Sequence, residues 1–170
     1  MPKPLRLGLI GDNIAQSQSP RLHGLAGLQF GIEVQFDLLV PREQGLAFGP
    51  LLESLPARGY RGVSVTYPYK EQAMARVVVP DDSVRALGAV NTVIFEGGDA
   101  IGFNTDYSGF MAAYRQARPQ APGDVLLIGT GGVGRAIAFA LARLGATRLR
   151  LVDQESAKAD LLASVLRQTF

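Results

Sequence analysis

The chain has 170 residues, of which 47% are hydrophobic and 19% are charged, so it is long enough to bury the core of an ordinary globular protein. Its 17 basic and 15 acidic residues give a net charge of +2. The basic residues form no run, so we expect no nucleic acid partner. Cysteine is absent and His23 is the single histidine, which excludes disulfides, thiolate nucleophiles and histidine-rich metal clusters.

Two kinds of apolar segment are missing from the sequence. The N-terminal residues lack the long apolar region of a signal peptide. No apolar stretch approaches the roughly 20 residues that a membrane-spanning helix needs. We therefore expect a cytoplasmic protein without a membrane partner.

Short apolar runs alternate with helix-like segments through the first hundred residues. Ser19 followed by Pro20 predicts a helix with Ser19 as its N-cap, and Gly31 is placed to end it. Glu96-Gly97-Gly98-Asp99 predicts a hairpin turn. This alternation favours a mostly parallel α/β sheet with one antiparallel hairpin. We expect strands at residues 5–10, 34–40, 62–66, 90–95 and 100–103, and helices at 19–30, 46–55 and 71–76.

A domain boundary is predicted near residue 105. Residues 106–118 have helical spacing, and residues 119–124 combine two prolines and a glycine without apolar periodicity. The helix has to leave one sheet and lead to the next. We therefore expect a first domain at residues 1–105 and a second at residues 106–170.

The second domain opens with a strand, a glycine turn and a helix. Residues 125–128 are apolar, residues 129–134 read Gly-Thr-Gly-Gly-Val-Gly, and residues 135–144 form an apolar helix. This order matches the dinucleotide-binding fingerprint of a Rossmann domain, in which the glycines allow a tight turn, close approach to a pyrophosphate and close helix packing. Alone, such a motif also occurs as a simple packing turn, but its strand and helix context favours a cofactor.

An acidic residue follows the next predicted strand, at residues 149–152. Asp153 lies 19 residues beyond Gly134, where a carboxylate accepts hydrogen bonds from the ribose hydroxyls of NAD and repels the 2′-phosphate of NADP. NAD is therefore favoured over NADP. The candidate cofactor-binding residues are Gly129, Thr130, Gly131, Gly132, Val133, Gly134 and Asp153.

Four polar motifs lie near the ends of predicted elements in the first domain. They are Ser17-Gln18-Ser19-Pro20, Val65-Thr66-Tyr67-Pro68-Tyr69-Lys70, Ala89-Val90-Asn91-Thr92 and Gly102-Phe103-Asn104-Thr105-Asp106. Each has an ordinary structural explanation when taken alone: loop and cap serines, a solvated lysine, a turn asparagine and an N-cap at Asp106.

Together, the order and spacing of these motifs resemble the shikimate and quinate dehydrogenase family, in the manner of shikimate 5-dehydrogenase. The family shares a Ser-x-Ser-Pro loop, an Asn-Val-Thr-x-Pro-x-Lys segment, an Ala-Val-Asn-Thr strand and a Gly-x-Asn-Thr-Asp junction before its Rossmann domain. The resemblance extends from residue 9 to Asp153. It implies an NAD(P)-dependent oxidoreductase of aromatic amino-acid biosynthesis or quinate use. Such an enzyme interconverts 3-dehydroshikimate and shikimate, or 3-dehydroquinate and quinate.

The resemblance also implies roles for individual residues. Lys70 and Asp106 become the catalytic pair, with Lys70 acting on the oxygen at ring carbon 3 and Asp106 orienting it. Whether Lys70 exchanges a proton with this oxygen or polarises it as a cation stays open. The substrate-binding residues are Ser17 and Ser19 for the carboxylate, and Thr66, Asn91 and Asp106 for the ring hydroxyls.

Two positions depart from the family pattern. Ser64 replaces the usual asparagine, so a shorter hydroxyl stands in place of one amide contact to the ring, which leaves the choice between shikimate and quinate open. Asp153-Gln154-Glu155 replaces the Asn-Arg-Ser or Asn-Arg-Thr of NADP-specific members, which agrees with NAD.

The sequence ends at Phe170, soon after a helix begins at residues 161–166, so it holds only the first half of the predicted Rossmann domain. A complete domain needs on the order of a hundred more residues. We expect a fragment of a longer enzyme or a short paralogue, and little dehydrogenase activity from residues 1–170 alone. The alternatives are a non-catalytic ring-acid or nucleotide sensor and another Rossmann dehydrogenase acting on a small hydroxy acid. The oligomeric state stays open, a homodimer included.

Overall fold

The computed structural model describes residues 3–170, and Met1 and Pro2 at the start of the N-terminal segment lie outside the described residues. The chain forms two compact units, which are described separately. Unit 1 contains the residues up to Pro80 together with Val90–Phe103. Unit 2 contains Asp81–Ala89 and Asn104–Phe170. The division of substrate and cofactor binding at residue 105 stays a prediction.

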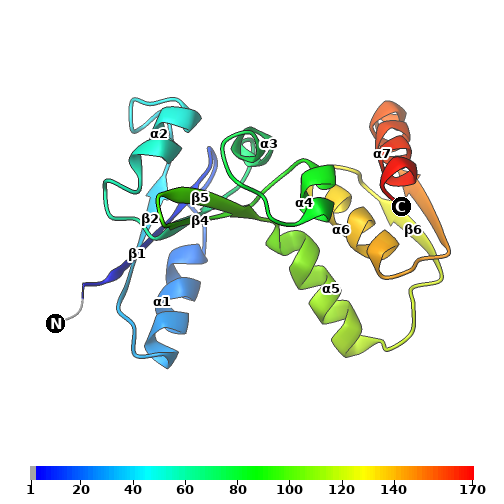
Figure 1. The fold of residues 1–170 in the computed structure, drawn as a ribbon, viewed down its shortest axis with the longest axis horizontal. Coiled ribbons are helices and arrows are strands. Elements are labelled where there is room, and N and C mark those ends of the chain that lie inside the picture. The colour runs from blue at the N-terminus through cyan, green and yellow to red at the C-terminus, as the bar shows by residue number, and fades with distance from the viewer. Residues whose placement is uncertain (1–2) are drawn as a thin grey trace. The chain divides into compact units, whose positions relative to one another are not determined.

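Unit 1 is built on a five-stranded sheet with the order β2-β1-β3-β4-β5 (Figure 1). Strand β1 pairs in parallel with β2 and β3, whereas β4 pairs antiparallel with β3 and β5, so only β4 runs against the others. This confirms the mostly parallel sheet and its hairpin. The strands are β1 (Leu5–Ile10), β2 (Val34–Leu39), β3 (Gly62–Val65), β4 (Thr92–Glu96) and β5 (Asp99–Phe103).

The two faces of this sheet differ in burial. Alternate residues Ile10, Val65 and Val93 point to a face that is fully buried, whereas Leu7 and Phe36 point to the opposite face and are half-buried. Helices α2 (Phe48–Ser54) and α3 (Lys70–Met74) lie on one side of the sheet in Figure 1, and α1 (Ser19–Gln29) lies on the other.

Two local predictions in unit 1 need correction. Helix α1 begins at Ser19 itself and its N-cap is Gln18, because the carbonyl of Gln18 accepts the first helical hydrogen bond, from the N–H of Leu22 at 2.9 Å. The hairpin turn is also tighter than predicted. Its strands extend through Glu96 and Asp99, because Gly97 and Gly98 both adopt positive φ angles, 61° and 94°, which suit a two-residue turn.

Unit 2 has the strand, helix, strand, helix order of the start of a Rossmann domain, which confirms the predicted fold class. Strands β6 and β7 are parallel neighbours, and the buried side chains of Phe139, Leu141 and Leu162 form much of the core. The elements are α4 (Asp82–Leu87), α5 (Thr105–Ala117), β6 (Asp124–Ile128), α6 (Gly132–Arg143), β7 (Arg148–Val152) and α7 (Ser156–Thr169).

Helix α4 has no counterpart among the predicted elements. The side chain of Asp81 accepts hydrogen bonds from the backbone N–H groups of Ser83 and Val84, and Gly88 ends the helix in the left-handed conformation with φ 75°. These two residues are ordinary signals for the start and end of a helix. The helix is only six residues long, too short for its apolar spacing to reveal it.

Candidate functional sites in the two units

In unit 1, the loops after β1 and β3 lie side by side. Because these strands are parallel, their carboxyl ends meet at one edge of the sheet. The N–H of Thr66 donates to the carbonyl of Ile10 at 2.9 Å, and the N–H of Asp12 donates to the carbonyl of Tyr67 at 3.2 Å. A Cβ at Gly11 would lie 2.4 Å from Thr66 Cγ2, so this close approach requires glycine.

The structure places Ser17 and Ser19 together at the start of α1. Their hydroxyl oxygens are 3.1 Å apart, with Ser17 donating, and the N–H of Ser19 donates to Ser17 Oγ at 3.2 Å. One turn later, His23 Nδ1 lies 2.9 Å from the carbonyl oxygen of Ser19, and its ring packs on Phe36 at 4.6 Å. The two hydroxyls therefore form one polar cluster on a loop that is anchored at the helix.

Backbone hydrogen bonds bring Lys70 and Asn91 to the same edge. Lys70 is the first residue of α3, and its carbonyl accepts the N–H of Val90 at 3.1 Å. The carbonyl of Asn91 accepts the N–H of Val65 at 2.7 Å, and its side-chain oxygen accepts the hydroxyl of Thr92 at 2.9 Å. Segments that are far apart in sequence thus meet around the end of β3.

Two of the predicted substrate-binding residues are placed differently. Ser64 lies within β3 on the half-buried face, where it lines a cavity of about 310 Å³ together with His23 and Phe36. Asp106 is in the first turn of α5 and belongs to unit 2. Unit 1 therefore carries Ser17, Ser19, Thr66, Lys70 and Asn91 at one edge, and the pairing of Lys70 with Asp106 stays a prediction.

Asn104 is a residue whose importance the sequence reasoning missed. It is 2% exposed and is the N-cap of α5, because its Oδ1 accepts the N–H of Tyr107 at 3.0 Å. Its Nδ2 donates to the carbonyl of Ala89, also at 3.0 Å. The N-cap is thus Asn104 and not Asp106, and it fixes the turn that carries Asp106. An asparagine before a helical segment is the signal that could have identified it.

In unit 2, the glycine turn has the backbone geometry that its sequence requires. Gly129 follows β6 with φ 94°, and a Cβ at Gly134 would lie 2.0 Å from the carbonyl oxygen of Gly129. A Cβ at Gly131 would meet nothing within 4 Å. Helix α6 begins at Gly132, so its first N–H groups are available to an anion.

Beside this turn, a cavity of about 470 Å³ opens at the carboxyl ends of β6 and β7. Its lining residues are Ile128, Gly129, Val152, Asp153 and Gln154. Open α/β sheets bind ligands at this edge. The turn, the helix N-terminus and the cavity together fit the pyrophosphate and adenosine portions of a dinucleotide.

Asp153 is held by hydrogen bonds at the end of β7. Its Oδ2 accepts the N–H of Thr130 at 2.7 Å and the hydroxyl of Thr130 at 2.8 Å, and its Oδ1 accepts the N–H of Glu155 at 3.0 Å. These bonds lower the pKa of Asp153 to about 2, and the bond from the backbone N–H of Thr130 has the largest effect. The carboxylate is therefore charged at neutral pH, and Oδ1 retains capacity for a ribose hydroxyl. The sequence reasoning did not foresee the partnership with Thr130.

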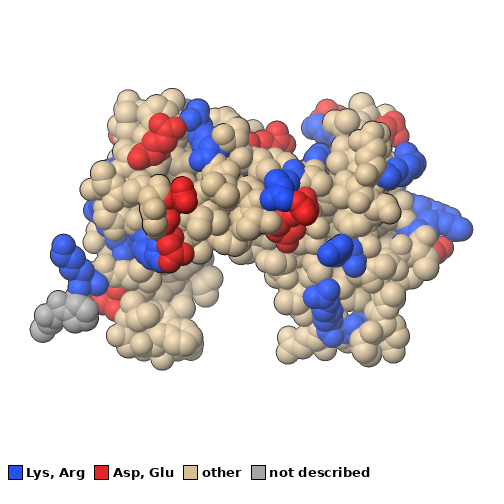
Figure 2. Space-filling view, viewed as in Figure 1, with Lys and Arg blue, Asp and Glu red and all other residues tan. Residues whose placement is uncertain are grey.

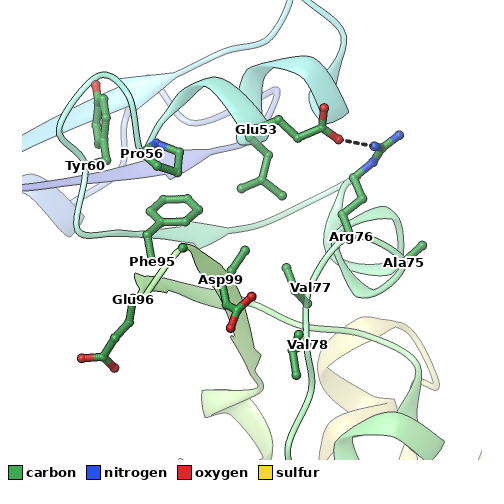
Figure 3. A pocket seen from close by; sticks show the side chains of 14 residues that line it. Glu53, Pro56, Tyr60, Ala75, Arg76, Val77, Val78, Phe95, Glu96 and Asp99 are labelled. Carbon is green, nitrogen blue, oxygen red and sulfur yellow. Dashed lines mark hydrogen bonds and ion pairs between the residues drawn. The ribbon is translucent and has the colours of Figure 1, made fainter.

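A further cavity of about 700 Å³ lies elsewhere in unit 1, and none of the predicted site residues lines it. Figure 3 shows Phe95 and Asp99 from the hairpin and the ion pair between Glu53 and Arg76, whose Oε1 and Nη1 are 2.8 Å apart. On the face drawn in Figure 2, Lys and Arg side chains are scattered among Asp and Glu.

Residues 3–170 contain no helix with the length and apolar character to cross a membrane. The same residues hold no group of three or more acidic or histidine side chains suited to a metal ion.

Comparison with known proteins identifies the family. The model of the "Shikimate dehydrogenase substrate binding domain" matches residues 9–93, half of the chain. The quinate/shikimate dehydrogenase (NAD⁺) of Corynebacterium efficiens is 34% identical over 169 residues, which cover 96% of this chain and 60% of that protein.

Two solved structures are similar to the chain. Quinate dehydrogenase from Corynebacterium glutamicum in complex with NAD gives a TM-score of 0.90 at 33% identity, covering 97% of this chain and 60% of that one. Shikimate 5-dehydrogenase from Thermus thermophilus in complex with NADP(H) and shikimate gives 0.83 at 34% identity, covering 96% and 61%. The chain thus spans about 60% of the length of these relatives. With a substrate-domain match over half of its length and these two structures superposing on nearly all of it, the chain belongs to the shikimate dehydrogenase family.

Proposed function

We propose that the chain supplies the ring-acid site and the first part of the cofactor site of a dehydrogenase that acts on shikimate or quinate. The observation that carries this proposal is the meeting of the Ser17, Thr66, Lys70 and Asn91 segments at one edge of the unit 1 sheet. Related proteins are named as dehydrogenases of shikimate or of both acids. A cytoplasmic location and a role in aromatic amino-acid biosynthesis or quinate use belong to the same proposal.

The chemistry of this edge suits a carboxylate on a hydroxylated ring. The hydroxyls of Ser17 and Ser19 lie within hydrogen-bonding distance of each other and can both turn toward one carboxylate. The hydroxyl of Thr66 and the amide of Asn91 supply donors and acceptors for ring hydroxyls. Ser64, on the adjoining face of β3, contributes a shorter side chain than the usual asparagine, so shikimate and quinate both remain candidate substrates.

The reaction moves a hydride and a proton. A dinucleotide held by residues 129–134 and Asp153 would supply the hydride chemistry at ring carbon 3. Lys70 acts at the oxygen on that carbon, either by exchanging its proton or by polarising it as a cation, and Asp106 orients Lys70. Because charge develops on this oxygen in the transition state, the lysine acts on turnover more than on ground-state binding.

NAD is the preferred cofactor in this proposal. The charged Asp153 repels a 2′-phosphate and accepts a hydrogen bond from a ribose hydroxyl. Gln154 and Glu155, which follow it, carry no positive charge that would bind a 2′-phosphate. Relatives with either cofactor are known, since the names include both NAD⁺ and NADP⁺ enzymes. The preference therefore depends on this chain's own residues.

Calorimetric titration of the protein with shikimate, quinate, NAD and NADP tests the proposal. Replacing both Ser17 and Ser19 with alanine should weaken ring-acid binding at least about tenfold, since two hydrogen bonds to a charged group are lost. Ser54→Ala is the matched control, because the Ser54 hydroxyl donates to the carbonyl of Leu51 within α2, far from the serine loop in sequence. Binding of neither acid, or equal losses in the variant and the control, would reject the ring-acid site.

The catalytic assignment has a separate test. In a version of the chain extended to a catalytically complete enzyme, Lys70→Ala should lower kcat for shikimate-dependent or quinate-dependent reduction of NAD at least about a hundredfold and change KM far less. An unchanged kcat with a raised KM would show that Lys70 only binds the substrate.

A further inference from the structure

Asp12 and Tyr69 join the two loops that carry the predicted ring-acid site. The hydroxyl of Tyr69 donates to Asp12 Oδ1 at 2.6 Å, and the two residues are 57 positions apart in sequence. Asp12 lies in the loop after β1, and Tyr69 immediately precedes Lys70. Neither residue belongs to the set with predicted contacts to substrate, so the bond between them needs another explanation.

On the Tyr69 side, the bond acts on the start of α3. Tyr69 is the N-cap residue of this helix, and its carbonyl accepts the N–H of Ala73 at 2.8 Å. Its ring stacks on Phe48 of α2, with centroids 4.8 Å apart and planes 6° apart, and Phe48 is 3% exposed. A ring held on a buried neighbour and a hydroxyl held by Asp12 leave Tyr69 little freedom. Lys70, the next residue, starts from a fixed backbone position.

On the Asp12 side, the bond acts on the serine loop. The N–H of Asp12 already donates to the carbonyl of Tyr67, so the residue is joined to the second loop by both backbone and side chain. Ile14 is 4% exposed and packs into a cluster with Leu9 and Val40, and its carbonyl accepts the N–H of Ser17. The position of Ser17 therefore depends on that of Asp12, because both are connected to Ile14, which is held in the core.

We propose that Asp12 is a positioning residue of the ring-acid site: its hydrogen bond with Tyr69 sets the separation between the Ser17–Ser19 cluster and Lys70. The inference rests on the proposed function, because a ring acid has to reach both groups at once. The bond to Asp12, followed by burial, raises the pKa of the Tyr69 hydroxyl above its usual range, so tyrosine remains a donor at neutral pH. A site whose loops are already ordered before the ligand arrives loses less binding free energy to their ordering than a flexible site does.

Four variants of the protein test this proposal. Tyr69→Phe keeps the ring on Phe48 and removes the donor, and Asp12→Ala removes the acceptor. Asp12→Asn keeps an oxygen that accepts the Tyr69 hydroxyl, so it should restore the site. Tyr67→Phe is the matched control, because Tyr67 is 73% exposed and its hydroxyl makes no hydrogen bond that the structure records in residues 3–170.

The main measurement compares shikimate with cyclohexanecarboxylate, which offers a carboxylate on a ring without hydroxyls. Tyr69→Phe and Asp12→Ala should each weaken shikimate binding about tenfold, because Thr66, whose carbonyl accepts the N–H of Tyr69 at 2.9 Å, would be displaced together with Lys70. The double variant should be no weaker than either alone. Cyclohexanecarboxylate, which meets only the serine cluster, should change by less than about twofold. Equal losses for both ligands, additive effects of the two substitutions, or failure of Asp12→Asn to restore binding would overturn the positioning role.

Amide NMR spectra of the ligand-free protein keep this test separate from that of the proposed function. If the unsubstituted protein bound neither acid, the proposed function would fail, whereas the coupling of the two loops would still be measurable. Tyr69→Phe should then shift the amides of Ser17, Ser19 and Lys70, and Tyr67→Phe should leave the two serines unchanged. Unshifted serine amides in Tyr69→Phe would contradict the inference even if ring acids bind.

Discussion

The two candidate sites are built in opposite ways. In unit 2, the turn at residues 129–134 is continuous in sequence, and the distant Asp153 is joined to it by its hydrogen bond with Thr130. In unit 1, residues of three separate segments meet through backbone hydrogen bonds that join β1, β3 and the start of β4. A local site depends on individual backbone positions, whereas a dispersed site depends on the bonds that hold its segments in register.

Gly134→Ala should have the largest effect, because the local site is formed by the backbone of the turn itself. The new Cβ would lie 2.0 Å from the Gly129 carbonyl oxygen, so the turn or helix α6 has to move. We expect a loss of about 3 kcal/mol in the free energy of unfolding and no measurable NAD binding. Chemical denaturation measures the loss. Gly132→Ala controls for it, since a Cβ there meets nothing within 4 Å, and equal stability of the two variants would contradict the account.

Asn104→Ala should follow, with a loss of about 2 kcal/mol, because a buried residue gives up its N-cap bond to Tyr107 and its bond to Ala89. Asn13→Ala, at an exposed position, is the control for the denaturation experiments. Asn104→Ala also tests whether a single cap positions the turn that carries Asp106. A loss no greater than that of the control would show that packing alone holds α5.

Tyr60→Phe tests a hydrogen bond that stabilises unit 1, which carries the dispersed site. Burial favours the neutral acid at Asp37, but hydrogen bonds from Tyr60 at 2.6 Å and Arg6 at 3.0 Å outweigh it and lower the Asp37 pKa below 3.8. We expect Tyr60→Phe to lower the free energy of unfolding by about 1 kcal/mol at neutral pH.

The pH dependence of this effect has a definite sign. A lowered carboxyl pKa stabilises the fold above the unfolded-state value near 3.8, and the stabilisation is lost as pH falls through the folded-state pKa. The difference in Tm between the unsubstituted protein and Tyr60→Phe should therefore be constant from pH 7 to about 5 and shrink below pH 4. Tyr67→Phe should show no difference at any pH. A difference that grows on acidification would refute the assigned role of Asp37.

Thr130→Val should have the smallest effect, since it removes one of the three hydrogen bonds to Asp153 and leaves both backbone donors. We expect the pKa of Asp153 to rise from about 2 toward its ordinary value of 3.8, and NAD affinity to fall about threefold. Thr130→Ser, which keeps the hydroxyl, is the control. Carboxyl carbon NMR titration and calorimetry measure the two quantities, and an unchanged Asp153 pKa would show that the hydroxyl bond is unimportant.

The contrast between the sites also explains what the sequence could predict. Residues 129–134 lie between an apolar strand and an apolar helix, so periodicity and glycine spacing indicate the turn without outside knowledge. The alternation of strands and helices in unit 1, and the hairpin turn at Gly97 and Gly98, could also be predicted from the sequence. Helix α4 was not predicted, because six residues are too few to show helical periodicity.

The site in unit 1 could be assembled from sequence only through the family resemblance. Nothing local to Ser17 or Lys70 indicates that their segments meet, because the bonds that join them are made by strand neighbours such as Ile10 and Thr66. Asp12 and Tyr69 illustrate the same limit. Their hydrogen bond spans 57 residues, and neither residue type has a spacing rule that would pair them.

Residue-resolved amide NMR tests the claim that the chain carries a ring-acid site in unit 1 and a dinucleotide site in unit 2. Shikimate or quinate should shift the amides of Ser17, Ser19, Thr66, Lys70 and Asn91, whereas NAD should shift those of residues 130–134 and Asp153. Asp153→Ala should weaken NAD binding and narrow the preference for NAD over NADP, and Asp160→Ala, on an exposed face of α7, should preserve both. Shifts from the acids confined to the cavity around Phe95 and Asp99, or shifts from NAD outside the glycine turn, would contradict the claim.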